Sequence, residues 1–121
     1  MAVEIAAQTH LSRQIRSSLA WPIAGLFTNW TLGQAQILGA KGIRCNVVSP
    51  GPIFIEGGDW DRIKQGMAPF FEATEKGHPG GALGTGQDVA DAVTFLVSSR
   101  AAHINGVNLT VDGGFLKRVN Y

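Results

Sequence analysis

Few side chains in this sequence are of types that commonly carry chemistry, and they are scattered. Cys45 alternates into an expected core strand, where a thiol behaves as a small apolar residue, and Ser49 lacks the context of a nucleophile elbow. The histidines lie far apart, in no spacing typical of metal ligands: His10, His78 and His103. The sequence therefore indicates neither a metal centre nor a nucleophilic catalyst built on these groups.

Three carboxylates are close together in the sequence, at Glu56, Asp59 and Asp61. A charged loop is usually solvated, so we favour that interpretation over an acidic site.

Gly84 and Gly86 form one G-x-G, but it follows a loop and lacks a third glycine. This pair is better interpreted as the beginning of a helix than as a phosphate-binding turn.

The composition is that of one globular domain. The chain has 121 residues, long enough to bury a single core. Hydrophobic residues make up 45% and charged residues 16%. The formal net charge of +1 comes from scattered Lys and Arg without a run of like sign. These features argue against nucleic acid or an anionic membrane as a partner.

Cysteine usage and the N-terminal composition bear on the compartment. Cys45 is the only cysteine, which fits a reducing environment, and we expect the cytoplasm. No apolar stretch reaches membrane-spanning length, and polar residues interrupt the first twenty positions, unlike a signal peptide. Arg13, Arg16 and nearby serines weakly resemble a transit peptide, but an amphipathic helix explains them at least as well.

Two helices are predicted before the first strand. Apolar residues recur every four positions over Val3–Leu19, which indicates a first helix. A second helical pattern covers Pro22–Ala40, with proline suited to the first turn and Gly42 suited to a C-terminal cap.

A β-rich run over residues 43–49 follows, closed by Pro50-Gly51-Pro52, whose prolines lack amide hydrogens. A helix followed by a buried strand indicates a parallel sheet. Residues 57–86 are rich in glycine and predict a mobile excursion with short helices over 59–65 and 69–76.

The last third predicts another helix and strand. Thr85 is suited to cap the helix, with Asp88 as the return partner. The expected buried face of this helix comprises Val89, Ala92, Val93 and Leu96. After a turn at Asn105-Gly106, the run Val107–Asp112 reads as a strand. The predicted fold class is α/β: a partial, truncated doubly wound parallel sheet with helices packed on two strands.

Four segments in order resemble the distal half of short-chain dehydrogenases/reductases, oxidoreductases that move a hydride between NAD(P) and an alcohol or carbonyl. The segments are Lys41-Gly42-Ile43-Arg44-Cys45-Asn46, Ser49-Pro50-Gly51-Pro52-Ile53, Asp88-Val89-Ala90 with Phe95-Leu96, and Gly106 with Val111-Asp112-Gly113-Gly114. The resemblance begins near Gln34. We therefore interpret residues 34–121 as the family-like half and residues 1–33 as a helical segment of unclear origin, both within one domain.

The resemblance implies a site beside the nicotinamide of NAD or NADP. The family's Pro-Gly turn lies there, and its counterpart here is Pro50, Gly51, Pro52 and Ile53. A turn that merely ends a strand is an equally weighted interpretation. Ile55 stands where the family often has a threonine that could bond the cofactor, which makes binding by this chain alone doubtful.

The excursion matches the family's variable substrate loop. Trp60 could cover a substrate, but we favour a buried anchor for a short helix. The segment over residues 79–84 resembles a family turn that usually has arginine at the Ala82 position.

Two parts of the family's machinery are missing from these 121 residues. The sequence has no glycine-rich turn followed by a helix that would hold a pyrophosphate. The family register places the catalytic tyrosine and lysine positions at Ala20 and Ala24, and neither alanine can carry a proton. The single tyrosine is Tyr121, so no Tyr-x-x-x-Lys pair is present.

We therefore interpret the sequence as a truncated dehydrogenase-like chain, and three functions compete. The one that we favour is an oxidoreductase by resemblance that is inactive alone. The others are a regulatory or oligomerisation subunit of a full-length dehydrogenase, and an enzyme completed by a separate chain. The resemblance implies self-association or pairing with a similar chain through Pro22–Ala40 and Val107–Asp112. The substrate, and the preference between NAD and NADP, depend on the variable loop and on the proximal half.

Overall fold

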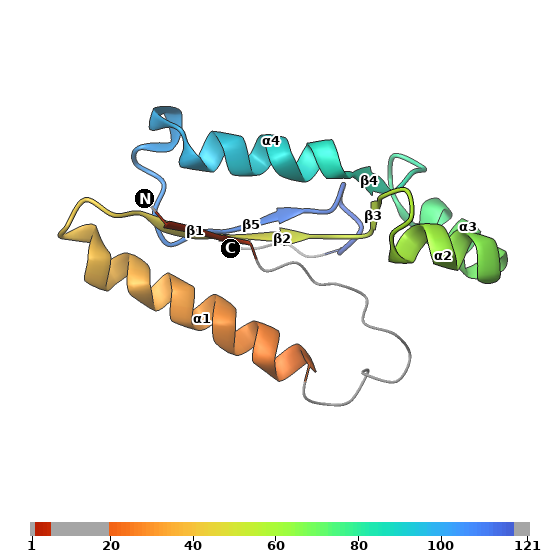
Figure 1. Cartoon of the computed structure of the whole chain (residues 1–121), viewed down its shortest axis with the longest axis horizontal. Helices are drawn as coiled ribbons and strands as arrows, with labels where there is room; N and C mark the ends of the chain where they lie inside the picture. Colours follow the sequence, from red (N-terminus) through yellow and green to blue (C-terminus); the bar gives the residue numbers. More distant parts are fainter. Residues whose placement is uncertain (1, 6–19, 118–121) are drawn as a thin grey trace.

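The computed structural model describes residues 2–5 and 20–117, and it has an α/β fold in three layers (Figure 1). A small parallel sheet lies in the middle, with α1 (Ala20–Gly39) over one face and α4 (Gly86–Val97) over the other. The predicted α/β class is confirmed. No helix within the described ranges is long and apolar enough to cross a bilayer.

The sheet has three parallel strands in the order β1-β2-β5. These are β1 (Ala2–Ile5), β2 (Cys45–Pro50) and β5 (Asn108–Val111). The central strand β2 is buried from Cys45 through Val48, at no more than 3% exposed, because helices cover both of its faces. The run of apolar residues that predicts a buried strand is confirmed here.

The predicted first helix is wrong at its beginning. Ala2–Ile5 forms strand β1, with Val3 paired to Asn46 of β2, and residues 6–19 lie outside the described ranges. Over so short a stretch an apolar repeat fits both periodicities, and β-branched Val3 and Ile5 favour the extended form. The open backbone edge of β2 supplies the pairing that local pattern alone does not contain.

The second predicted helix is confirmed as α1, but its apolar pattern does not mark its buried face. Thr31 and Ala35 face the sheet at 3% and 2% exposed. The large apolar residues are instead open to solvent: Leu26 at 68%, Phe27 at 51%, Trp30 at 59% and Ile37 at 64%. We call this set the α1 apolar face. After α1, Gly42 adopts a φ of +71°, the left-handed conformation expected of a helix-ending glycine.

The excursion is a helical hairpin with its own aromatic core. It comprises β3 (Ile53–Phe54), α2 (Asp59–Gly66), α3 (Ala68–Gly77) and β4 (Gly84–Thr85). Trp60 and Phe71 are 6% and 5% exposed and lie 6.4 Å apart between ring centroids. Both predicted short helices are confirmed, and the parallel pairing of β3 with β4 is an addition.

Helix α4 begins as the sequence predicts. The Thr85 hydroxyl accepts from the Asp88 amide, and the Asp88 carboxylate accepts from the Thr85 amide, which completes a capping box. Its inner face joins a core around Val48, Leu96 and Ala101. The partly buried residues packed on this core are Val89, Val93, Ile104, Val107, Leu109 and Val111.

The capping box makes stability depend on pH. Bonds of 2.7 Å from the hydroxyl and the amide of Thr85 lower the pKa of Asp88, the side-chain bond most. A lowered pKa adds stability that is present above the unfolded value and is lost as pH falls through the folded value. Asp88→Asn should therefore lower the urea midpoint at neutral pH, and its difference from wild type should vanish in acid.

The matched control for this experiment is Asp91→Asn, which alters an exposed carboxylate of the same helix. Urea titrations of all three proteins across the acid range make the comparison. If the urea midpoint of Asp88→Asn still differs from that of wild type at a pH where carboxylates are protonated, the capping box is not the cause of the pH dependence.

Candidate functional site

The turn formed by Pro50, Gly51, Pro52 and Ile53 lies where the carboxyl end of β2 meets the end of β5. The Gly51 amide donates to the Val111 carbonyl at 2.9 Å, and the Gly84 amide donates to the Pro52 carbonyl at 3.0 Å. Ligands of open parallel sheets bind outside the carboxyl ends of the strands. The candidate residues therefore occupy the edge of the sheet at which a ligand is expected.

Two backbone groups of this turn already form hydrogen bonds. Two of its residues are prolines without an N–H, and the hydrogen bonds above use the Gly51 amide and the Pro52 carbonyl. Because neighbouring residues of a strand direct their backbone groups to opposite sides, the N–H and C=O of Ile53 face away from β4. The backbone N–H and C=O of Ile53 therefore take no part in the pairing of β3 with β4.

Gly51 is required by packing. A Cβ placed on it would lie 2.5 Å from the Asp112 Cβ and 2.8 Å from the Asp112 Cα. Two of the four family-like segments, around Gly51 and around Asp112, are therefore in contact. This contact supports a structural role for the Pro-Gly turn, whatever else the turn binds.

Asp112 organises the turn that follows β5. Its Oδ1 accepts from the Gly114 amide and its Oδ2 from the Leu116 amide, both at 2.9 Å. Gly113 and Gly114 have φ values of +58° and +79°, which favour glycine. The Asp-Gly-Gly motif is thus explained by the local geometry of the turn.

Arg44 and Asn46 join β2 to the loop before β5. The Arg44 guanidinium donates to the Leu96 carbonyl at 2.7 Å and to the Ile104 carbonyl at 3.0 Å. Asn46 is 0% exposed, donates to the Ile104 carbonyl and accepts from the Val107 amide, both at 3.1 Å. Our sequence analysis missed both roles, although a polar asparagine inside an apolar strand was a usable signal.

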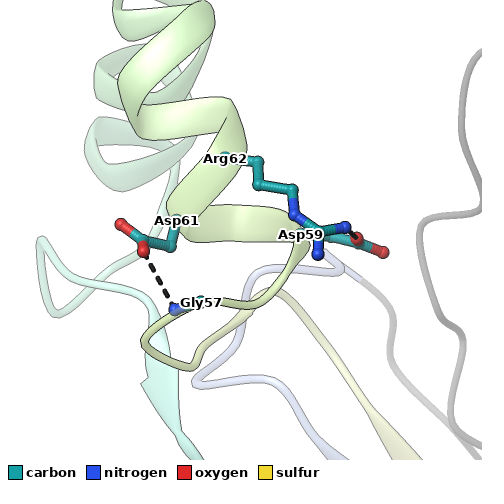
Figure 2. Close-up of polar contacts among 4 residues, drawn as sticks. All are labelled: Gly57, Asp59, Asp61 and Arg62. Carbon is teal, nitrogen blue, oxygen red and sulfur yellow. Dashed lines mark hydrogen bonds and ion pairs between the residues drawn. The ribbon is translucent and has the colours of Figure 1, made fainter.

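The acidic residues of the excursion do not converge. Figure 2 shows Asp61 accepting from the Gly57 amide at 2.9 Å, while Asp59 points the other way and pairs with Arg62 at 3.4 Å. Glu56 is exposed. Within the described ranges no group of three His, Cys, Asp or Glu could hold a metal ion. These carboxylates organise the beginning of α2 locally.

The cysteine, serine and histidine side chains are the remaining candidates for chemistry. Cys45 is buried in β2 with a free thiol, as predicted, and the Ser49 hydroxyl donates to Asn108 Oδ1 at 2.8 Å. His103 is exposed and His78 is buried, whereas His10 lies outside the described residues. Among those of these groups that the structure describes, no nucleophile is paired with a base.

Trp60 is a buried anchor. Its ring stacks on Phe70 at 6.0 Å and 8°, inside the hairpin core. Ile55 and Ala82, which stand where the resemblance leads us to expect threonine and arginine, are both exposed.

The two family positions for the proton-transferring pair lie on α1. Ala20 begins the helix and Ala24 lies one turn later, whereas Tyr121 lies outside the described residues.

A shallow groove at the opposite, amino ends of the strands is lined by Gly39, Arg44, Ser98 and Asn105, among others. It does not reach the Pro-Gly turn.

Comparison with known proteins places these features in a family. The family model for enoyl-(acyl carrier protein) reductase matches residues 18–116. An uncharacterised oxidoreductase of Schizosaccharomyces pombe is 41% identical over 93 residues, 77% of this chain and 35% of its own length. Isoepoxydon dehydrogenase of Aspergillus clavatus is 42% identical over 77 residues, 64% of this chain and 30% of its own length.

Solved structures agree with this match. A putative 2-deoxy-D-gluconate 3-dehydrogenase from Agrobacterium tumefaciens with bound NADP has a TM-score of 0.79 at 30% identity, covering 96% of this chain and 46% of its own. An oxidoreductase of the short-chain dehydrogenase/reductase family from Burkholderia thailandensis has a TM-score of 0.70 at 33% identity, covering 78% and 37%. The chain spans about a third of the length of the curated relatives it matches, 30% for the first of them. Fold, motifs and relatives agree: the chain belongs to the short-chain dehydrogenase/reductase family.

Proposed function

We propose that this chain is the distal half of an NAD(P)-dependent short-chain dehydrogenase/reductase-like oxidoreductase, and that the 121-residue polypeptide does not transfer hydride alone. The observation that carries the proposal is the pair Ala20 and Ala24, at the helical positions where the family has its tyrosine and lysine. The tyrosine of such a pair acts as general acid or base, and the lysine lowers its pKa. Alanine supplies neither group.

The nicotinamide-facing turn is the part of a cofactor site that this chain carries. The N–H and C=O of Ile53 match the acceptor and donor of a carboxamide, and a nicotinamide cofactor would supply the hydride chemistry. Two relatives support a nicotinamide cofactor, one solved with NADP and an L-rhamnose 1-dehydrogenase named for NAD(P)(+). Without a glycine-rich turn for the pyrophosphate, we expect the turn alone to hold a cofactor weakly.

A hydride-transfer assay tests the proposal that the chain alone is inactive. The purified chain is mixed with NADH or NADPH and a panel of aldehydes and ketones, and the absorbance of the reduced nicotinamide is followed. We expect no oxidation above the buffer rate. Turnover that is proportional to protein and is lost in Ile53→Pro, which removes the Ile53 N–H, would contradict the proposal.

The partner that we favour is a second copy of the chain. The α1 apolar face is open to solvent, and the whole of α1 contains no charged residue. In a two-fold pair the same helix face of each copy meets the other, so a helix without charged residues brings no like charges together. The outer edge of β5 is a second exposed surface that a copy could extend.

Sedimentation velocity tests this pairing. We expect wild type to self-associate as concentration rises, and Trp30→Lys to stay monomeric, because it puts two lysines into the same apolar contact. Ile55→Lys is the control, since Ile55 is 57% exposed but lies outside α1. A wild-type monomer at all concentrations, or equal association of the two variants, would refute the pairing.

The alternative is a non-catalytic subunit that joins a full-length dehydrogenase. One relative favours it: a protein named inactive 2-(S)-hydroxypropyl-CoM dehydrogenase 2, from Xanthobacter autotrophicus, is 35% identical over 74% of this chain. Co-purification of the tagged chain with such an enzyme, lost in Trp30→Lys, would favour this alternative.

We also propose a cytoplasmic location, supported by the free thiol of Cys45.

A further inference from the structure

His78 ends helix α3 and lies against the segment that follows β5. The residue is 5% exposed, and its ring stacks on Phe115 with centroids 4.5 Å apart. Its Nδ1 is 2.9 Å from the Thr74 carbonyl, and because a carbonyl accepts, Nδ1 is the donor. The side chain of the residue that caps α3 thus lies between that helix and the segment after β5.

The segments on either side of this ring fit closely. A Cβ on Gly77 would lie 3.2 Å from the Phe115 ring, and one on Gly114 would lie 3.4 Å from Pro79. Helix α3 also contacts β3 through Phe71, whose ring packs edge-on against Phe54 with centroids 6.1 Å apart. Phe54 directly follows the Pro-Gly turn, so α3 has one ring contact next to the candidate site and one, through His78, with the segment after β5.

The histidine contact is incompletely satisfied. With Nδ1 as the donor, Nε2 of the neutral ring is an acceptor, and it is buried with no hydrogen-bond partner among the described residues. A buried polar atom without a partner loses its hydration and gains nothing in return. Opening of the contact lets water reach Nε2, so opening costs less here than at a fully bonded junction.

Glycines lie next to the contact in both segments. Gly80 and Gly81 follow His78 and Pro79, with Gly81 at a φ of +71°, and Gly113 and Gly114 precede Phe115. Short glycine-containing stretches are suited to absorb the backbone rotation of a hinge. The ring contact therefore lies between two potential hinges.

We propose that the contact between His78 and Phe115 is a latch, and that α3 and residues 113–117 are freed together when this contact opens. The contact opens before the sheet does, because the core around β2 contains no such unsatisfied contact among the described residues. The latch operates on the fold itself and does not require that a cofactor binds.

Amide hydrogen exchange of the whole chain, followed by mass spectrometry, tests the latch. His78→Ala should speed exchange in α3 and in residues 113–117 by the same factor, about tenfold or more from losing one hydrogen bond and one ring contact. Exchange in β2 should not change. His103→Ala, an exposed histidine, is the control and should leave both segments as in wild type.

Acceleration of one segment without the other, or an equal acceleration of β2, would overturn the proposal. Wild type provides a second test that does not depend on how the variant folds. In low urea, the amides of α3 and of residues 114–116 should share one opening free energy and one urea dependence, both smaller than those of β2. Different values for the two segments would also overturn it.

Discussion

Gly51→Ala is expected to destabilise the fold by about 3 kcal/mol, at the upper end of overpacking costs. The added methyl group would lie 2.5 Å from the Asp112 Cβ and 2.8 Å from its Cα. The obstacle is backbone and the first side-chain atom, so no rotamer change relieves it. The ends of β2 and β5 would have to separate, which weakens the bond from the Gly51 amide to Val111.

Urea unfolding measures this effect, with Gly33→Ala as the matched control. Gly33 lies within α1, and a Cβ there would meet nothing within 4 Å. Alanine in a helix interior is more stable than glycine by about 0.5–1 kcal/mol, so the control should shift the other way. Equal stability of Gly51→Ala and wild type would show that the two strand ends are not in contact.

Asn46→Ala is expected to cost about 2–3 kcal/mol, because it leaves buried polar groups unpaired. Asn46 is 0% exposed and is the acceptor for the Val107 amide. After truncation this N–H would lose its side-chain acceptor at the edge of the apolar core. The loop before β5 would also lose one of its bonds at the Ile104 carbonyl, while the bond from Arg44 stays.

Asn108→Ala is the control for Asn46→Ala, because Asn108 is an exposed asparagine in the neighbouring strand that bonds the Ser49 hydroxyl. Exposed substitutions of this kind usually change stability by about 0.5 kcal/mol or less. Thermal or urea unfolding of both variants makes the comparison. If the two variants lose the same stability, the bonds of Asn46 do not hold the loop.

Features that depend on neighbouring residues were predictable from the sequence. The capping box of Thr85 and Asp88 lies within four residues, and the hairpin helices follow local apolar spacing. Gly42 could be predicted as a helix end because its preferred φ is a property of the residue itself. These elements carry their own signals in the chain.

Features that depend on distant pairing were not predictable. Strand β1 exists through its register with β2, about forty residues away in the sequence, and its own pattern suggests a helix just as well. Asn46 and Val107 are separated by 61 positions, and neither residue type announces the other. The exposure of Trp30 and Ile37 likewise depends on which side of α1 meets the sheet.

The candidate site was also predictable from the sequence only in part. Its position at the carboxyl edge of a parallel sheet follows from the strand order, and the Pro-Gly turn was identified in advance. The close approach of Asp112, which makes Gly51 a packing requirement, needs the three-dimensional arrangement. The anchor interpretation of Trp60 agrees with its burial, and the division of the chain at residue 34 stays a prediction.

The central claim is that these 121 residues form a dehydrogenase-like fold without a complete cofactor and catalytic site. Isothermal titration with NADH and NADPH, alongside circular dichroism that monitors folding, tests it most directly. We predict a folded protein and no measurable binding at micromolar cofactor. Micromolar binding by the folded chain would contradict the account, because it would require a pyrophosphate site that the sequence does not contain.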